Sequence, residues 1–143
     1  MDHIAIMKPS WNLIANVIDG TKTVESRWYK SKRCPWDRVK IGDILYFKDV
    51  GKPVSIKSRV TRVEQYEVRD NENAIKIMNK YSLADLGTSI LPKEVEDYIT
   101  NKKYAVFVHF NNVELVSPFA IDKKGYGMQC AWITTENVND LII

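Results

Sequence analysis

One junction between a helix and a strand constrains the fold of this chain more than any other feature. Between Pro9 and Gly20, apolar residues recur at helical spacing, and the glycine stands where a left-handed residue commonly ends a helix. The next segment, Thr23 to Tyr29, carries β-branched and aromatic residues at the alternating spacing of a strand. We therefore expect a short helix that ends at Gly20 and leads directly into a strand.

The remaining apolar segments indicate strands at both ends of the chain and one helical block in the middle. Because this order does not alternate regularly between strand and helix, it disfavours a doubly wound parallel sheet and favours an α+β fold built on a small mixed β-barrel. Asn111 and Asn112 are expected to bend one long run into a hairpin, since asparagine tolerates positive φ. Strands are predicted over 3–7, 44–48, 54–66, 104–116 and 130–134, helices over 71–80 and 93–99, and a short turn over 83–87.

Length and composition bound the class of protein. A chain of 143 residues with 45% hydrophobic residues suits a single domain over 1–143. No run approaches the roughly 18 apolar residues of a membrane span, and the N-terminus lacks the pattern of a secretory signal, so we expect a cytoplasmic protein with no membrane partner. Cys34 and Cys130 fit neither a disulfide framework nor a ligand motif, so no metal and no cofactor are expected.

Positive charge is concentrated in the first part of the chain. Residues 1–62 contain 13 basic and 6 acidic side chains, a balance of +7, whereas residues 63–143 contain 8 and 12, a balance of −4. Basic groups attract phosphates and aromatic faces stack on bases, so this cluster has the composition of a nucleic-acid or nucleotide surface. In an arbitrary protein, a solvated basic loop whose aromatic side chains turn into the core would explain the same composition. The basic cluster is Lys22, Arg27, Lys30, Lys32, Arg33, Arg38 and Lys40, interleaved with Trp28, Tyr29 and Trp36.

The residues after the first helix also fit a known signature. Gly20, Lys22, Glu25 and Arg27 fit the string G-x-K-x-x-E-x-R, which resembles the signature of the ASCH domain, a branch of the PUA-like β-barrels. The segment from Lys40 to Phe47 is similar to the turn and second barrel strand of that family. The resemblance implies a PUA-like small mixed β-barrel with peripheral helices over most of the chain, and a function in binding RNA or a nucleotide, with DNA as a possible partner.

The strand pattern and the charges define a candidate binding site. Alternation along a strand places Glu25 and Arg27 on one face, while Lys22 belongs with them only if it lies in the preceding turn. The structural alternative is a salt-bridged trio that braces the barrel. We expect a cleft lined by Lys22, Glu25 and Arg27, with Lys30, Lys32 and Arg33 on backbone phosphates and with stacking from Tyr29, Trp36 or Tyr126.

Two other classes of function stay open from the sequence: an enzyme that acts on modified nucleosides or RNA, and a protein-interaction module. Some bacterial relatives of ASCH type are amidohydrolases that remove an acyl group from modified cytidines with the signature lysine and a threonine, but Glu25 stands at the position of that threonine and cannot replace its hydroxyl. Other relatives are linked to ribonuclease activity, in which Lys22 could act as a base or electrostatic stabiliser and Glu25 as a proton acceptor. The acidic region over 63–98 could instead serve protein interaction, although an ordinary solvated helical surface has the same composition.

Overall fold

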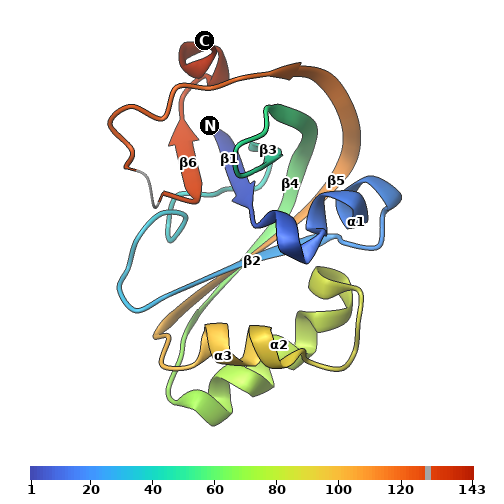
Figure 1. Ribbon diagram of the computed structural model, residues 1–143. Helices are drawn as coiled ribbons and strands as arrows, with labels where there is room; N and C mark the ends of the chain where they lie inside the picture. The colour runs from blue at the N-terminus through green and yellow to red at the C-terminus, as the bar shows by residue number, and fades with distance from the viewer. Residues whose placement is uncertain (128–129) are drawn as a thin grey trace.

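The chain forms a six-stranded sheet that curls into a half-barrel, accompanied by three α-helices (Figure 1). The computed structural model describes residues 1–127 and 130–143. The strand order is β2-β5-β4-β3-β1-β6, in which β1 and β3 are parallel and the other neighbours antiparallel. The strands are β1 (Asp2–Met7), β2 (Val24–Tyr29), β3 (Ile44–Asp49), β4 (Val54–Glu67), β5 (Tyr104–Phe119) and β6 (Trp132–Thr135). The helices are α1 (Leu13–Asp19), α2 (Asn71–Leu86), α3 (Lys93–Ile99) and the 3-10 helices η1 (Pro9–Trp11) and η2 (Val138–Leu141).

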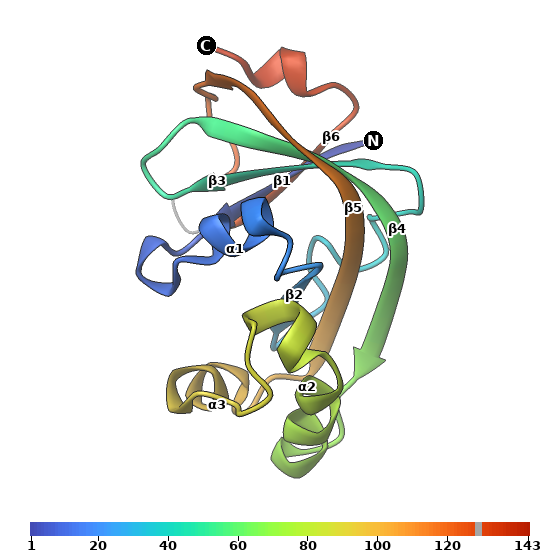
Figure 2. The same cartoon turned by 90° about the vertical axis from the view of Figure 1, so that its right-hand side faces the viewer.

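This architecture confirms the expected α+β class and the barrel-like sheet. The long strands β4 and β5 pair along most of their length and bend together, which produces the curl seen in Figure 2. Their pairing contains three register shifts, and such irregularities increase strand bending and twist. Strands β2 and β6 are the two edges of the curled sheet.

Two sequence expectations about the interior of the chain are wrong. Asn111 and Asn112 do not end a strand, because β5 continues to Phe119 and the positive φ of Asn112 (53°) falls within a register shift against β4. Residues 83–87 are not a separate turn either. The helix α2 extends to Leu86, and Gly87 ends it with φ of 74°.

The expected junction between a helix ending at Gly20 and a following strand is confirmed, with one break in the helix. Asn12 has φ of 54° and separates η1 from α1, so the expected continuous helix is two short ones. Gly20 ends α1 in the left-handed conformation, with φ of 84° and its N–H bonded to the carbonyl of Val17. The strand β2 follows after three residues. Leu13 and Val17 form the buried face of α1, whereas Ile18 is half exposed.

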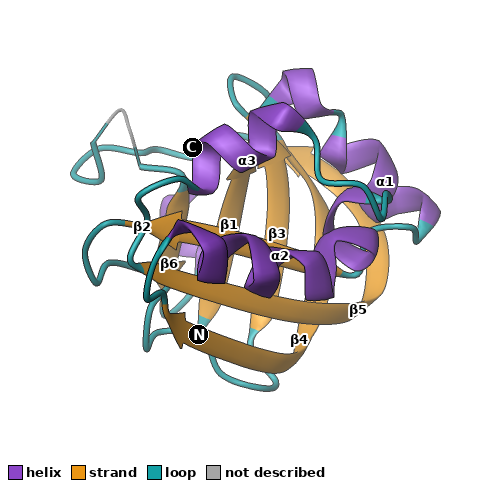
Figure 3. Ribbon diagram, turned by 90° about the horizontal axis from the view of Figure 1, so that it is seen from below, coloured by secondary structure: helices purple, strands orange, loops and turns teal. Residues whose placement is uncertain are grey.

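Side chains on the two faces of the sheet pack into separate clusters. Inside the curl, residues of β1, β3, β4 and β5 pack with Leu13 and Val17 of α1. Beneath the sheet, α2 and α3 pack against β2 and β5 around Trp28 and Phe107, whose rings meet edge to face at 5.8 Å. Figure 3 shows these helices lying across the strands when the molecule is seen from below. The signature segment thus lies between the half-barrel and the helical layer.

Candidate functional site

Lys22 lies in the turn before β2 and is fully buried. Its backbone N–H donates to the carbonyl of Asn16, and the next N–H, that of Thr23, donates to the carbonyl of Ala84 in the last turn of α2. These bonds fix the turn between α1 and α2. The side chain then reaches the C-terminal end of α2, where a cation is favoured by the helix dipole.

The ammonium of Lys22 is engaged by protein oxygens. Nζ donates to the carbonyl oxygens of Val24 (2.6 Å) and Asp85 (3.0 Å), and it forms a close ion pair with the Asp85 carboxylate. Glu25 Oε1 lies 3.5 Å away. A charge removed from water is costly unless it is paired and hydrogen-bonded, and Lys22 meets both conditions.

Asp85 is the member of this cluster that the sequence analysis missed. Besides Lys22, its carboxylate accepts a hydrogen bond of 2.5 Å from Ser26 Oγ. The signal was present in the periodicity of α2, because Asp85 continues the buried positions Met78, Tyr81 and Ser82 at helical spacing. The predicted helix ended at Lys80, so the spacing was not followed as far as Asp85. In a longer helix, the same spacing places the Asp85 carboxylate on the buried face.

Glu25 and Arg27 share one face of β2, as strand alternation predicted. Arg27 Nη2 lies 3.5 Å from Glu25 Oε2, and the same guanidinium donates to the carbonyl oxygens of Ala131 (2.9 Å) and Ile6 (3.3 Å). It also lies over the ring of Trp132, at 5.4 Å from the centroid. Arg27 therefore hydrogen-bonds to backbone carbonyl oxygens of β1 and of the segment before β6.

A cavity of about 280 Å³ opens beside these charged groups. It is bounded by β2, by α2 and α3, and by the chain between β1 and α1. Lys22 is not among its lining residues and lies behind Glu25 and Asp85. The apolar wall includes Trp11, Leu13, Trp28, Met78, Val95 and Tyr98, and the polar lining residues include Lys8, Glu25, Ser26, Arg27 and Asp85.

Three residues of this cavity carry buried polar atoms that have no hydrogen-bond partner among the residues the structure describes. They are Glu25 Oε2, Trp11 Nε1 and Trp28 Nε1. The first is an acceptor and the other two are donors. Buried polar atoms are normally paired, and an unpaired one costs free energy, so this acceptor and these two donors are available to hydrogen-bond with polar atoms that enter the cavity. Trp11 thus belongs to the cavity wall.

A second depression, of about 460 Å³, adjoins the cavity at Ala131, which lines both. It brings together three of the predicted binding residues: Tyr29, Arg33 and Tyr126. The guanidinium of Arg33 lies 5.4 Å from the centroid of the Tyr29 ring. Trp132, on the far side of the Arg27 guanidinium, also lines this depression.

The other predicted residues lie apart from both hollows. Lys30 and Lys32 are exposed on the loop after β2. Trp36 is half buried, packs against the central core and meets Tyr104 edge to face at 5.1 Å, with the ammonium of Lys32 5.9 Å from its ring centroid. Neither Lys30, Lys32 nor Trp36 is a lining residue of the cavity or of the second depression.

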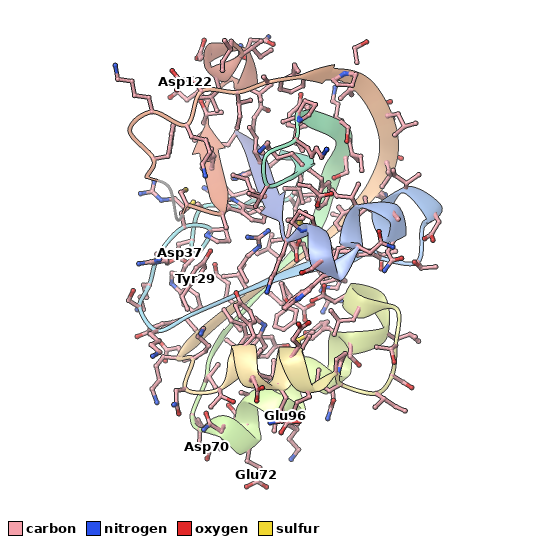
Figure 4. All side chains as sticks on the ribbon, viewed as in Figure 1. Tyr29, Asp37, Asp70, Glu72, Glu96 and Asp122 are labelled. Atoms are coloured by element: carbon pink, nitrogen blue, oxygen red, sulfur yellow. The ribbon has the colours of Figure 1, made fainter. Side chains whose placement is uncertain are left out.

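Acidic side chains gather at the opposite end of the molecule. In Figure 4, Asp70, Glu72 and Glu96 lie at the helical end, away from Tyr29.

His3 and His109 are engaged with carboxylates outside the cavity: His3 Nε2 is 2.8 Å from Asp43, and His109 Nε2 is 2.6 Å from Glu64. Within 1–127 and 130–143, no group of three or more His, Cys, Asp or Glu residues is arranged to hold a metal ion.

Comparison with known proteins places this geometry in a known fold. The sequence matches no protein-family model and no curated protein. The structure is similar to that of an ASCH protein from Zymomonas mobilis, with a TM-score of 0.67 and 14% identity over 99% of this chain and 96% of the other. The chain has the ASCH-domain fold. Two single-substitution variants of the same Zymomonas protein align as well. One has a TM-score of 0.67 and 14% identity over 99% of this chain and 99% of its own. The other has a TM-score of 0.66 and 15% identity over 94% of this chain and 88% of its own.

The ASCH fold and the half-barrel agree with what the signature segment implied. In the described part of this ASCH-fold chain, no helix is long and apolar enough to cross a membrane.

Proposed function

We propose that this ASCH-fold protein binds single-stranded RNA, or a nucleotide from it, by holding one base in the cavity beside β2. The observation that carries the proposal is the buried Oε2 of Glu25, which accepts no hydrogen bond from the described residues and has the Arg27 guanidinium 3.5 Å away, at an aromatic-walled cavity of about 280 Å³. This volume is near the lower end of small-molecule sites, about 300–1,000 Å³. A flat heteroaromatic ring with hydrogen-bonding edges suits such a space.

The charge balance of the cavity favours a neutral group. Lys22 and Arg27 are matched by Glu25 and Asp85, so the four buried charges cancel. A phosphate placed among them would meet two carboxylates and find both cations already paired. An exocyclic amino group of a base can instead donate to Glu25 Oε2, and ring nitrogens or carbonyl oxygens of the base can accept from the indole N–H groups.

Cationic groups for phosphates lie at the rim of the cavity and outside it. Lys8 is exposed at the rim and lies over the Trp11 ring, at 5.4 Å from its centroid. Arg33 lines the adjoining depression, and Lys30 and Lys32 are exposed on the same loop. A base can therefore enter the apolar cavity while its phosphate stays near lysine and arginine side chains, the division of labour typical of single-strand binding.

The experiment is a calorimetric titration of the protein with ribonucleoside monophosphates, using two tryptophan variants. Trp11→Leu alters the cavity wall, whereas Trp36→Leu alters a tryptophan of similar burial away from the cavity. We expect saturable binding that Trp11→Leu weakens by about tenfold, in line with a stacking contact, and that Trp36→Leu leaves within about twofold. Absence of saturable binding, or equal effects of both variants, would contradict the proposal.

A second candidate function is hydrolysis at the same cavity. It is favoured by the hydrogen bond from Ser26 Oγ to Asp85, which places a hydroxyl beside a carboxylate able to accept its proton. Lys22 would then stabilise charge rather than act as a base, since its ammonium already donates to three oxygens. Incubating acylated cytidine and RNA with excess protein, and with the Ser26→Ala variant, tests this. Turnover that the variant loses supports an enzyme, and unchanged substrates exclude hydrolysis of these two.

A further inference from the structure

We propose that the second depression holds the nucleotide adjacent to the one in the cavity, so that the binding unit is two consecutive nucleotides of a single RNA strand. This inference rests on the proposed function and adds the length of the ligand and the residues that read its second position. Three observations carry it: a shared and rigid wall between the two hollows, the aromatic content of the second, and the difference in their charge.

The wall between the hollows is the backbone at Ala131, and it is held on two sides. Its carbonyl oxygen accepts from the N–H of Ile6 in β1 (2.9 Å) and from Arg27 Nη1 (2.9 Å). The same guanidinium lines the cavity and lies over the ring of Trp132, which lines the depression. One buried side chain thus lines the cavity and also contacts Ala131 and Trp132 in the wall of the depression.

The second depression offers stacking surfaces. The aromatic residues Tyr29, Tyr126 and Trp132 line it, and Tyr126 is more than one-third exposed. Bases stack on such rings without a requirement for a particular base, which suits a position that follows a more selective one. Tyr126 stands between two glycines with φ of 91° and 84°, a backbone that other residues rarely adopt.

The two hollows differ in charge. The four buried charges at the cavity cancel, whereas the depression has Arg33 and, among the described residues that line it, no aspartate or glutamate. A phosphate linking two nucleotides would therefore be favoured on the side of the depression. The same strand can then place a base in the neutral cavity, its phosphate near Arg33 and the next base on the tyrosines.

The test compares cytidine monophosphate with the dinucleotide cytidylyl-cytidine phosphate at low salt. We expect the dinucleotide to bind about tenfold more tightly, as one additional stacked base provides. Tyr126→Ala should remove most of this gain and leave the affinity for the mononucleotide within about twofold, whereas Arg33→Ala, which removes the cation nearest the shared phosphate, should weaken the binding of both compounds. Arg38→Ala, which changes an exposed arginine of the same loop that does not line the depression, should keep the gain.

The outcomes separate this inference from the proposed function. If the mononucleotide binds in a manner sensitive to Trp11→Leu but the dinucleotide binds no more tightly, the depression is not a nucleotide site and the cavity proposal stands. A gain that survives Tyr126→Ala also overturns the assignment. If neither compound binds, both proposals fall. Because Tyr126 and Arg33 are exposed loop residues, thermal unfolding of the variants should match that of the unchanged protein.

Discussion

Arg27 donates a hydrogen bond of 2.9 Å to the carbonyl oxygen of Ala131, 104 residues later in the chain. Arg27 belongs to the edge strand β2, and Ala131 directly precedes the other edge strand, β6. The open side of the half-barrel is therefore bridged by a side chain. On one side of this bridge lies the neutral cavity, and on the other lies the depression that contains Arg33.

Removing the buried ammonium of Lys22 should strongly destabilise the protein. Lys22→Met leaves the Asp85 carboxylate buried without its cation, which costs about 3–5 kcal/mol. The measurement is the free energy of unfolding in urea. Lys93→Met serves as the control because it breaks an exposed ion pair with Asp97, and we expect almost no change from it. A similar midpoint for both variants would show that the buried pair contributes little.

Stability should fall as the pH drops below about 6.5, partly because of His3. Burial lowers the pKa of His3, and the neighbouring Asp43 carboxylate opposes this only in part. The unfolded chain therefore binds a proton at this histidine at a higher pH than the folded chain does, so folding loses stability from pH 6.5 down to the lowered pKa. Asp43, whose own pKa is lowered, adds a loss at more acidic pH, below its ordinary value of about 3.8.

The His3 contribution can be isolated by His3→Gln, which removes the titrating group. Besides Asp43, the ring of His3 faces Thr134 and Trp132, and the N-terminus and Asp2 lie near enough to affect its charge. Urea unfolding at pH 7.5 and pH 5.5 should show a larger loss of stability for the unchanged protein than for His3→Gln. Equal losses would place the pH dependence elsewhere.

Gly20 should tolerate asparagine better than alanine. Its φ of 84° lies in the left-handed region, and a Cβ at this position would meet no atom within 4 Å. The cost of Gly20→Ala is then conformational, about 1 kcal/mol, whereas asparagine enters this region more readily. Thermal unfolding of the two variants provides the comparison. If alanine were no worse than asparagine, the cap would not depend on backbone conformation.

RNA binding should depend on salt through the basic loop. Changing Lys30, Lys32 and Arg33 together to alanine should reduce the slope of log affinity against log salt by about 0.7 for each phosphate contact that is lost. The matched control changes the exposed Lys76, Lys80 and Lys93 of the helical end, which removes the same charge. The slopes are measured by titration with RNA at two salt concentrations. Equal slopes for the two triple variants would show that the basic loop does not contact RNA phosphates.

The local features of the signature segment could be predicted from sequence. The spacing of Glu25 and Arg27 on one strand face follows from the period of two, and the cap at Gly20 follows from its place after a helical pattern. The ASCH fold was predicted from the resemblance of the segment around Lys22, Glu25 and Arg27 to the family signature, and the order of the elements favoured a small mixed β-barrel. Such features depend on neighbours in the chain, which a sequence displays directly.

The partners of these residues could not be predicted in the same way. Asp85 reaches Lys22 only because α2 continues one and a half turns beyond Lys80, and Ala131 reaches Arg27 because the sheet curls until its two edges approach. The cavity wall combines β2 with α2 and α3, whose relative placement is set by packing around Trp28 and Phe107. These are long-range contacts, and no local pattern encodes them.

The most direct measurement is the ratio of the affinities for cytidine and uridine monophosphates. Cytosine has an amino group at position 4 and an acceptor nitrogen at position 3, whereas uracil has a carbonyl oxygen and an N–H at these positions. If Glu25 Oε2 accepts from a base, the unchanged protein should prefer the cytidine nucleotide by about tenfold. Glu25→Gln, whose amide can donate to a carbonyl, should abolish or invert the preference, whereas Glu67→Gln on the exposed surface should retain it. Equal affinities in the unchanged protein, or a preference untouched by Glu25→Gln, would contradict the account.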